Sequence, residues 1–425
     1  MIFSNITTPL LGLVDTAVIG HLEHSYYLGG IAVGSMIISI IFWLCGFLRM
    51  STTGVIAQSL GQGDDKLGWR YFIHSLTIAL AISLLLLVLQ LPLRELIFSL
   101  ISASDEVTHY GEIYFNIRIY SAPAALINLV ILGHLVASAR IKWLIYQLLC
   151  VNIINIALDL LFVVGFEWGV AGAAYASVIA DYCGLALLST VLYPQLKQQD
   201  LAVLLKLDIT MFRRLFSLNR DIFIRSVALQ LCLAFITITG ARLGDNVVAA
   251  NAILLHIFLF ASYGLDGFAY AAESMVGHAK GRRDIKEINR VVIAAAFWCG
   301  VLGVSFALAL WLWGETWIGW LTNISAVKQL ALQYLPWLVG VCVVSWLSFL
   351  MDGVYIGLTD TRAMRNSMLI ACLVFFVLWF SIGEILEPNQ LNHGVWLAFL
   401  GFIVTRGVTL SVKYYQNYQQ GRLLD

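Results

Sequence analysis

Long apolar stretches follow one another along almost the whole chain, and each is long enough to cross a lipid bilayer. A membrane-spanning helix needs about 20 predominantly apolar residues, and its backbone satisfies its own hydrogen bonds. Composition agrees, because the 425 residues are 60% hydrophobic and 12% charged, whereas about a quarter of an ordinary soluble domain is charged. The sequence therefore predicts an all-α integral membrane protein with twelve transmembrane helices, near residues 2–22, 28–50, 70–93, 112–138, 142–165, 169–193, 216–240, 246–277, 290–313, 326–357, 365–386 and 394–414.

The Lys and Arg residues are unevenly distributed between the two sides of these spans. Cytoplasmic loops carry the excess of both residue types. With both termini inside, eighteen Lys and Arg fall in the cytoplasmic loops and tail, and three fall in the opposite loops. We therefore expect a multi-pass protein of the cell inner (plasma) membrane with both termini cytoplasmic. The formal net charge is zero, and we expect no nucleic-acid partner.

The two halves of the chain resemble each other in order. AVIGHLEHSYYLGGIAVGSM is echoed by TITGARLGDNVVAANAIL, SLGQGDDK by GHAKGRRD, and LGHLVASARIK by DGVYIGLTDTR, at an offset of about 220 residues. Such internal repeats are typical of secondary transporters. The sequence predicts two pseudo-symmetric six-helix lobes with a substrate path between them, divided as an N-lobe at 1–193, a cytoplasmic linker at 194–215, a C-lobe at 216–414 and a cytoplasmic tail at 415–425.

Aspartates stand inside two of the N-lobe spans. Asp15 lies in LGLVDTAVIGHL, and the fifth span, LLCVNIINIALDLLFVVG, carries Asn152, Asn155 and Asp159. Spacings of three and four residues place those three side chains on one helix face. An acid inside a span is costly in lipid and is by default a functional hypothesis. Asp15 and Asp159 are expected at similar depth, where they could share one site.

Such a pair of acids suits a coupling ion. Burial and a second nearby acid both favour the protonated form of a carboxyl group, so Asp15 and Asp159 could take up and release a proton. Asn128 and Asn155 could hydrogen-bond either protonation state, or their carbonyl oxygens could join the two carboxylates around Na⁺. The competing interpretation is that the amides and acids only hold helices together. The residues alone do not decide between H⁺ and Na⁺.

The second half has acids of its own. Asp266 and Asp352 lie within spans and are each followed by Gly, which lets another backbone approach closely; both are candidates for substrate binding or gating, as is Asn152. Arg225 is a candidate counter-ion for one of them, in a salt bridge or a substrate contact. Asp221 follows an arginine near the cytoplasmic end and is interpreted as an ion-pair partner, whereas Glu273 is expected to be solvated.

Other residues inside the spans have more ordinary interpretations. Arg118 is a second candidate counter-ion, and His134 and His256 are interpreted as packing residues rather than proton carriers. Pro123 and Pro336 are expected to interrupt their helices. The seven cysteines form no CxxC pair or Cys/His cluster and are interpreted as packing residues.

The sequence fits neither an ATP-driven transporter nor an enzyme well. It has no Walker A loop and no soluble domain large enough to hydrolyse ATP, so energy is expected from an ion gradient. It also has no HExxH or Ser-His-Asp arrangement, so the chain is not expected to be an enzyme. We expect no cofactor other than the coupling ion, H⁺ or Na⁺. Membrane lipids are expected partners, and the chain is expected to be a monomer.

At several of these segments the chain resembles a known family. SNITTPLLGLVDTAVIGHL, RMSTTGVIAQSLGQGD, NIINIALD, GVAGAAYASVIADY and LNRDIFIRS resemble the multidrug and toxic compound extrusion (MATE) family, most closely its DinF branch. The resemblance implies the MATE fold and export of lipophilic or cationic compounds in exchange for H⁺ or Na⁺. It also implies proton coupling at Asp15 and a cation site that includes Asn128, Asn155 and Asp159. The alternative function is a lipid-linked precursor flippase of the same architecture.

Overall fold

The computed structural model describes residues 25–101, 103–200, 204, 206–383, 385, 387 and 390–424. Within these ranges the secondary structure is helical and no strand occurs. Eleven helical segments of the described residues are long and apolar enough to span a membrane. The first predicted span, 2–22, lies outside the described residues, and so does Asp15. The all-α prediction is confirmed.

The chain divides into two compact units, and we describe each by itself. Unit 1 comprises Met1–Ile56 and Asp64–Phe216, and unit 2 comprises Ala57–Gly63 and Ser217–Asp425. The longer part of unit 1 thus ends at Phe216, and the longer part of unit 2 begins at Ser217. The segment Ala57–Gly63, however, belongs to unit 2 although it precedes the third span.

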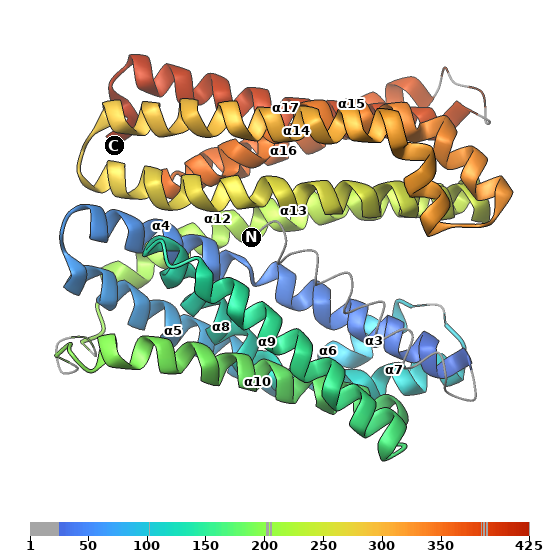
Figure 1. Ribbon diagram of the computed structural model, residues 1–425, viewed down its shortest axis with the longest axis horizontal. Helices are drawn as coiled ribbons and strands as arrows, with labels where there is room; N and C mark the ends of the chain where they lie inside the picture. The colour runs from blue at the N-terminus through green and yellow to red at the C-terminus, as the bar shows by residue number, and fades with distance from the viewer. Residues whose placement is uncertain are drawn as a thin grey trace. The chain divides into compact units, whose positions relative to one another are not determined.

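The helices of unit 1 overlap the predicted spans, although α4 continues to Gly61, past the predicted limit at 50, and α7 begins at Asp105, before the predicted limit at 112. Asp64 caps α5 by accepting a hydrogen bond from the Leu67 amide at 2.9 Å, as N-terminal Asp residues commonly do. In this unit α3 packs against α7, α5 against α8, and α10 against α7, α8 and α9 (Figure 1). The helices are α3 (Ser25–Leu44), α4 (Phe47–Gly61, which continues into unit 2), α5 (Asp65–Val88), α6 (Gln90–Ser99), α7 (Asp105–Arg118), α8 (Ala122–Ala137), α9 (Lys142–Asp159) and α10 (Gly169–Leu196).

Unit 2 is built around α15. This helix packs against α13, α14 and α17, and α16 packs against α17 (Figure 1). The core between the helices is aromatic and includes the fully buried Phe375, Trp396, Phe399 and Phe402. The helices are α12 (Ile209–Leu243, which begins in unit 1), α13 (Asp245–Gly281), α14 (Ile285–Leu321), α15 (Ser325–Leu358), α16 (Thr361–Gly383) and α17 (Leu391–Gln419).

The prediction that proline interrupts a helix is confirmed at Pro123, where a 3₁₀ turn separates α7 from α8, and it is wrong at Pro336. Pro123 stands in the first turn of α8, after a short 3₁₀ turn at Ile119–Ser121, a position where proline is well tolerated because its missing N–H has no partner in a helix. Pro336 lies inside α15, which continues without a break from Ser325 to Leu358. Transmembrane helices tolerate interior proline because neighbouring groups satisfy the freed carbonyl.

One predicted close approach is confirmed at Gly353, which follows Asp352 on α15. A Cβ at this position would lie 2.4 Å from the carbonyl oxygen of Ala269 on α13. Side-chain atoms do not fit at that distance from a backbone, so glycine lets α13 and α15 pack with their backbones in contact.

Candidate functional site

The C-terminal half of helix α9 buries its polar residues and exposes apolar ones. Asn152, Asn155 and Asp159 are 6%, 3% and 2% exposed, and they are the only buried residues of this helix. Between them, Ile153 is 64% exposed, and Leu160, just past Asp159, is 50% exposed. Lipid offers no hydrogen-bond partner, so a polar stripe on a spanning helix must face protein or water. The predicted stripe on one helix face is therefore present, and it faces the interior of unit 1.

Helix α10 holds two of the predicted asparagines. The amide nitrogen of Asn155 donates to the Ser177 hydroxyl at 3.2 Å, and that of Asn128 on α8 donates to the Asp181 carbonyl at 3.3 Å. Ser177 and Asp181 are one helical turn apart on the same face of α10. The structure thus brings Asn128 and Asn155 to a common helix, from α8 on one side and α9 on the other.

The side-chain oxygen of Asn128 is an unused acceptor. It is buried and has no hydrogen-bond partner among the described residues. Buried polar atoms are almost always satisfied by protein, water or an ion. Carbonyl and carboxylate oxygens are the ligands that hard cations prefer. An oxygen atom of this kind suits a water molecule or a small cation.

Directly after Asp159 the backbone changes its hydrogen-bond pattern. Leu160–Gly165 forms a π-helical segment, and the Phe166 amide donates to the Leu161 carbonyl five residues back at 2.9 Å. Such segments are rare and occur frequently at functional sites. The candidate site in unit 1 thus ends at a wider turn at the C-terminal end of α9.

Arg118 has a partner that sequence reasoning did not name. Its guanidinium forms an ion pair of 2.6 Å with Asp181, and the two side chains are 15% and 18% exposed. It also donates to the Ser121 hydroxyl and lies over the Phe42 ring, 5.7 Å from the centroid. Asp181 was visible in the sequence as an acid inside the sixth span, but it was not singled out. Arg118 is therefore engaged in a structural salt bridge.

Unit 2 contains a buried cluster of three charges. The Oδ2 atom of Asp352 on α15 accepts hydrogen bonds from Arg225 on α12 and from Arg406 on α17. The three side chains are 10%, 6% and 4% exposed. Arg225 was predicted as a counter-ion, but Arg406 was missed, although it lies in the middle of the span 394–414, whereas the other basic residue of that span, Lys413, stands at its end. Asp352 ties three helices of unit 2 together.

The remaining acids of unit 2 differ in their surroundings. Asp266 on α13 is half-buried and interacts electrostatically with Arg225, so the structure brings these two predicted residues together. The prediction that Glu273 is solvated is wrong, because its side chain is 1% exposed. Helix α15 packs directly over this turn of α13, where a Cβ at Gly357 would lie 2.8 Å from the Glu273 carbonyl oxygen.

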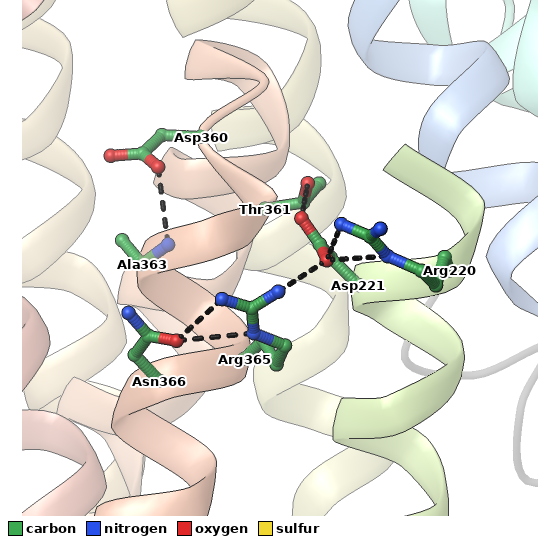
Figure 2. A network of polar contacts seen from close by, with 7 residues as sticks. All are labelled: Arg220, Asp221, Asp360, Thr361, Ala363, Arg365 and Asn366. Atoms are coloured by element: carbon green, nitrogen blue, oxygen red, sulfur yellow. Dashed lines mark hydrogen bonds and ion pairs between the residues drawn. The ribbon is translucent and has the colours of Figure 1, made fainter. Parts of the chain in front are cut away.

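Asp221 is confirmed as an ion-pair partner and has more partners than were predicted. Figure 2 shows its fully buried carboxylate between Arg220, Arg365 and Thr361. The Oδ1 atom accepts from Arg365 at 2.8 Å and from Arg220 at 3.1 Å, and Oδ2 accepts from Thr361 at 3.4 Å. The guanidinium of Arg365 in turn donates to Asn366 at 2.9 Å. This network joins α12 to the first turn of α16.

The two histidines have different environments. His134 is 4% exposed and packs against the rings of Trp69 and Phe72, with centroids 4.7 and 5.2 Å away. These contacts agree with the interpretation of His134 as a packing residue. His256 lies on an exposed face of α13.

These features define a class: a helical multi-pass membrane protein in which polar and charged side chains are buried inside two separate units. The MatE family model matches residues 1–161 and 222–380. DNA damage-inducible protein F of Escherichia coli (strain K12) is 41% identical over 99% of this chain and 91% of its own length. The multidrug export protein MepA of Staphylococcus aureus (strain N315) is 22% identical over 88% of this chain and 82% of its own length.

A solved structure gives the same fold. The crystal structure of MATE in complex with MaL6 aligns with 100% of this chain and 94% of its own, with a TM-score of 0.87 at 17% sequence identity. The chain therefore belongs to the MATE (MatE) family. It has the MATE fold, and members of this family are transporters rather than enzymes, as the sequence predicted.

Proposed function

We propose that the chain is a secondary active multidrug efflux transporter that exports lipophilic or cationic compounds in exchange for H⁺ or Na⁺. The family and the relative named as a multidrug export protein support export of small molecules. The observation that carries the coupling part of the proposal is the burial pattern of α9, in which Asn152, Asn155 and Asp159 are the only buried residues.

This burial pattern argues for an ion site rather than for helix packing alone. An aspartate is more costly to bury than an asparagine, because its charge must be compensated or protonated. A helix that needed only polar contacts could use asparagine at all three positions. Placing a carboxylate at position 159, one turn from Asn155, supplies a group that can hold H⁺ or Na⁺ and release it when water enters.

Asp15 is the last member of the proposed site, and it is assigned from the sequence alone. It lies outside the described residues, and its assignment rests on the LVDTAVIGHL segment and on the resemblance of that segment to the DinF branch. In the proposed cycle, uptake of the coupling ion at Asp15 and Asp159 from the outer side favours release of the substrate, and release of the ion inside resets the site. Asn128 and Asn155 stabilise the loaded site through their amide groups.

The buried arginines are the observation that bears on the flippase alternative. A flippase for lipid-linked precursors must bind a pyrophosphate headgroup, which requires cationic groups that are available to it. Here Arg118 faces Asp181, and Arg225 and Arg406 face Asp352. These guanidiniums are already bound by protein carboxylates, which favours the multidrug exporter.

Exchange in proteoliposomes tests the proposal. Purified protein is reconstituted, and efflux of a fluorescent lipophilic cation is followed under an imposed pH gradient and, separately, under an imposed Na⁺ gradient. We expect one of the two gradients to drive efflux, and Asp15→Asn and Asp159→Asn each to reduce gradient-driven efflux to the level of empty liposomes. A fluorescent lipid-linked pyrophosphate serves as the competing substrate, and gradient-driven movement of that lipid alone would favour the flippase.

Asp360→Asn is the matched control. Asp360 precedes α16 and accepts a hydrogen bond from the Ala363 amide at 3.1 Å, and asparagine caps a helix about as well as aspartate. This variant also loses one negative charge but should transport like the wild type. Efflux that is undiminished in both Asp15→Asn and Asp159→Asn would refute the coupling assignment.

The proposal includes placement in the inner membrane as a monomer with both termini cytoplasmic. The excess of Lys and Arg in the loops assigned to the cytoplasm supports the orientation, and the bacterial relative supports the membrane. Accessibility of single cysteines introduced near Gln62 and Ile324 to an impermeant maleimide tests the orientation. Labelling of position 324 from outside and of position 62 from inside is the expected result, and the reverse would contradict it.

A further inference from the structure

Two cysteines of unit 2 are in direct sulfur contact, although they are 140 positions apart in sequence. The Sγ atoms of Cys232 on α12 and Cys372 on α16 are 3.3 Å apart, and the Cys232 thiol donates to the Cys372 sulfur. The Cys372 thiol donates in turn to the carbonyl oxygen of Ala228, at 3.4 Å. All seven cysteines are free thiols. The two reduced thiols therefore form one hydrogen-bond chain, which runs from Cys232 to Cys372 and on to the Ala228 carbonyl.

The surroundings of the pair hold the two helices in register. One turn further along α12, the Phe235 ring packs against Phe375, Phe376 and Trp379 of α16, with centroids 5.7, 5.2 and 5.7 Å away. These large rings fix the separation of the two helices next to the thiols. The sulfur contact thus lies beside closely packed rings of the same two helices.

The pair lies beneath an apolar exposed surface. Cys232 is 0% exposed and Cys372 is partly exposed. The neighbouring residues Leu231 and Leu373 are 60% and 63% exposed. Because both helices span the membrane, this surface is suited to lipid, and Cys372 is the thiol that a lipid-soluble reagent meets first.

We propose that Cys232 and Cys372 are a modification site that forms a reversible disulfide when a lipid-soluble two-electron oxidant of the quinone class reaches Cys372. The Cys372 sulfur first bonds to the quinone ring. The Cys232 sulfur then attacks the Cys372 sulfur and displaces the reduced ring. Two S–H bonds break, one S–S bond forms, and the two electrons and two protons convert the quinone to a hydroquinone.

The two sulfur atoms need to move only a short distance to form the disulfide. A disulfide has an S–S length of about 2.05 Å, so the sulfur atoms must approach by about 1.3 Å from their separation of 3.3 Å. The product would cross-link α12 and α16 within unit 2.

The other cysteines of this unit provide the comparison. Cys299 on α14 donates to the Trp346 carbonyl oxygen at 3.6 Å rather than to a sulfur, and Cys342 lies on the neighbouring helix α15 and is 1% exposed. Both of these thiols are buried, whereas Cys372 is partly exposed. The second pair therefore serves as a control for thiols that are buried on adjacent helices without a hydrogen bond from Cys299 to a sulfur.

Thiol counting in liposomes tests the proposal. Full-length protein is incubated with decylubiquinone, unfolded, and labelled with a maleimide mass tag. We expect the wild type to fall from seven reactive thiols to five, and dithiothreitol to restore seven. Mass spectrometry of the digest should recover one cross-linked peptide, joining Cys232 to Cys372. Retention of all seven thiols, or cross-links that join other cysteines equally, would overturn the proposal.

Two variants that each retain only two of the seven cysteines provide a sharper test. One retains only Cys232 and Cys372, and the other retains only Cys299 and Cys342, with serine or alanine elsewhere. The first should lose both thiols in decylubiquinone and the second should keep both. Equal oxidation of the two variants would show that burial alone accounts for reactivity and would overturn the assignment. The readout is independent of transport, so it stands or falls separately from the proposed export function.

Discussion

The charge cluster of unit 2 yields a quantitative prediction for Asp352→Asn. This substitution keeps the size of the side chain but removes the carboxylate that forms ion pairs with both Arg225 and Arg406. Both guanidiniums are almost fully buried, at 6% and 4% exposure, so they cannot turn to water. Two cations would then face each other without a carboxylate between them.

The magnitude follows from that burial. Removing one partner of a buried ion pair costs about 3–5 kcal/mol. Both pairs share one carboxylate oxygen, so their contributions are not additive, and we expect a loss within this range rather than twice it. For a unit of about 200 residues, such a loss lowers the melting temperature by roughly 10 °C.

A melt in detergent, followed by a thiol-reactive dye, measures the effect. The control is Asp360→Asn, since Asp360 pairs with Lys413 at 3.9 Å and their side chains are 32% and 45% exposed. Exposed pairs contribute about 1 kcal/mol or less, so this variant should melt within about 3 °C of the wild type. A triple variant with Asp352→Leu, Arg225→Met and Arg406→Met should recover most of the stability, because well-packed apolar residues can replace a buried ion cluster.

Two outcomes would refute the reasoning. If Asp352→Asn has the same melting temperature as the Asp360→Asn control, the buried charge cluster does not stabilise unit 2 as described above. If the triple variant is as unstable as Asp352→Asn, the loss comes from packing at these positions and not from unpaired charge.

Three further predictions concern helix contacts and one partly exposed carboxylate. Gly353→Ala should destabilise unit 2 by about 1–3 kcal/mol because its Cβ meets a backbone carbonyl, whereas Gly340→Ala on the same helix, where the nearest atom is a leucine methyl at 3.9 Å, should be neutral in a thermal melt. Asp221→Asn should cost about 1.5–3 kcal/mol, measured in the same way, and a melt equal to the wild type would contradict the role of the network in Figure 2. Hydrogen bonds from Thr210 hold the pKa of the Asp208 carboxyl below its usual 3.8. The ionised carboxylate therefore stabilises the fold above pH 3.8, and this stabilisation is lost as the pH falls below that value. The difference in amide hydrogen exchange at Thr210 between Asp208→Asn and the wild type should thus stay constant down to about pH 4, and its disappearance already at pH 6 would contradict this.

The sequence predicted the helices and the polar face of α9 because both depend on local pattern. Apolar stretches of sufficient length define the spans, and spacings of three and four residues place Asn152, Asn155 and Asp159 on one face. The structure confirms both points. The roles of these residues in ion coupling stay predictions, and so does the pairing of Asp159 with Asp15, which lies outside the described residues.

The ion pairs were predicted incompletely because they depend on which helices are neighbours. Arg118 and Asp181 are 63 positions apart, and Arg406 and Asp352 are 54 apart. A single sequence shows the charges but not the packing that joins them. The error at Glu273 has the same origin, because only the contact of α13 with α15 reveals that this turn is covered by protein.

The burial pattern of α9 limits how this helix can move. From Leu148 to Leu158 its outer surface carries only residues that suit hydrocarbon, and its inner surface carries two amides and a carboxylate. Rolling the helix about its axis would turn Asp159 into lipid, at about 2.5–3.5 kcal/mol on insertion scales, and would gain nothing for the isoleucines that turn inward. Access to Asp159 should therefore change by bending at Leu160–Gly165 or by entry of water, while the helix keeps its orientation toward lipid throughout the cycle.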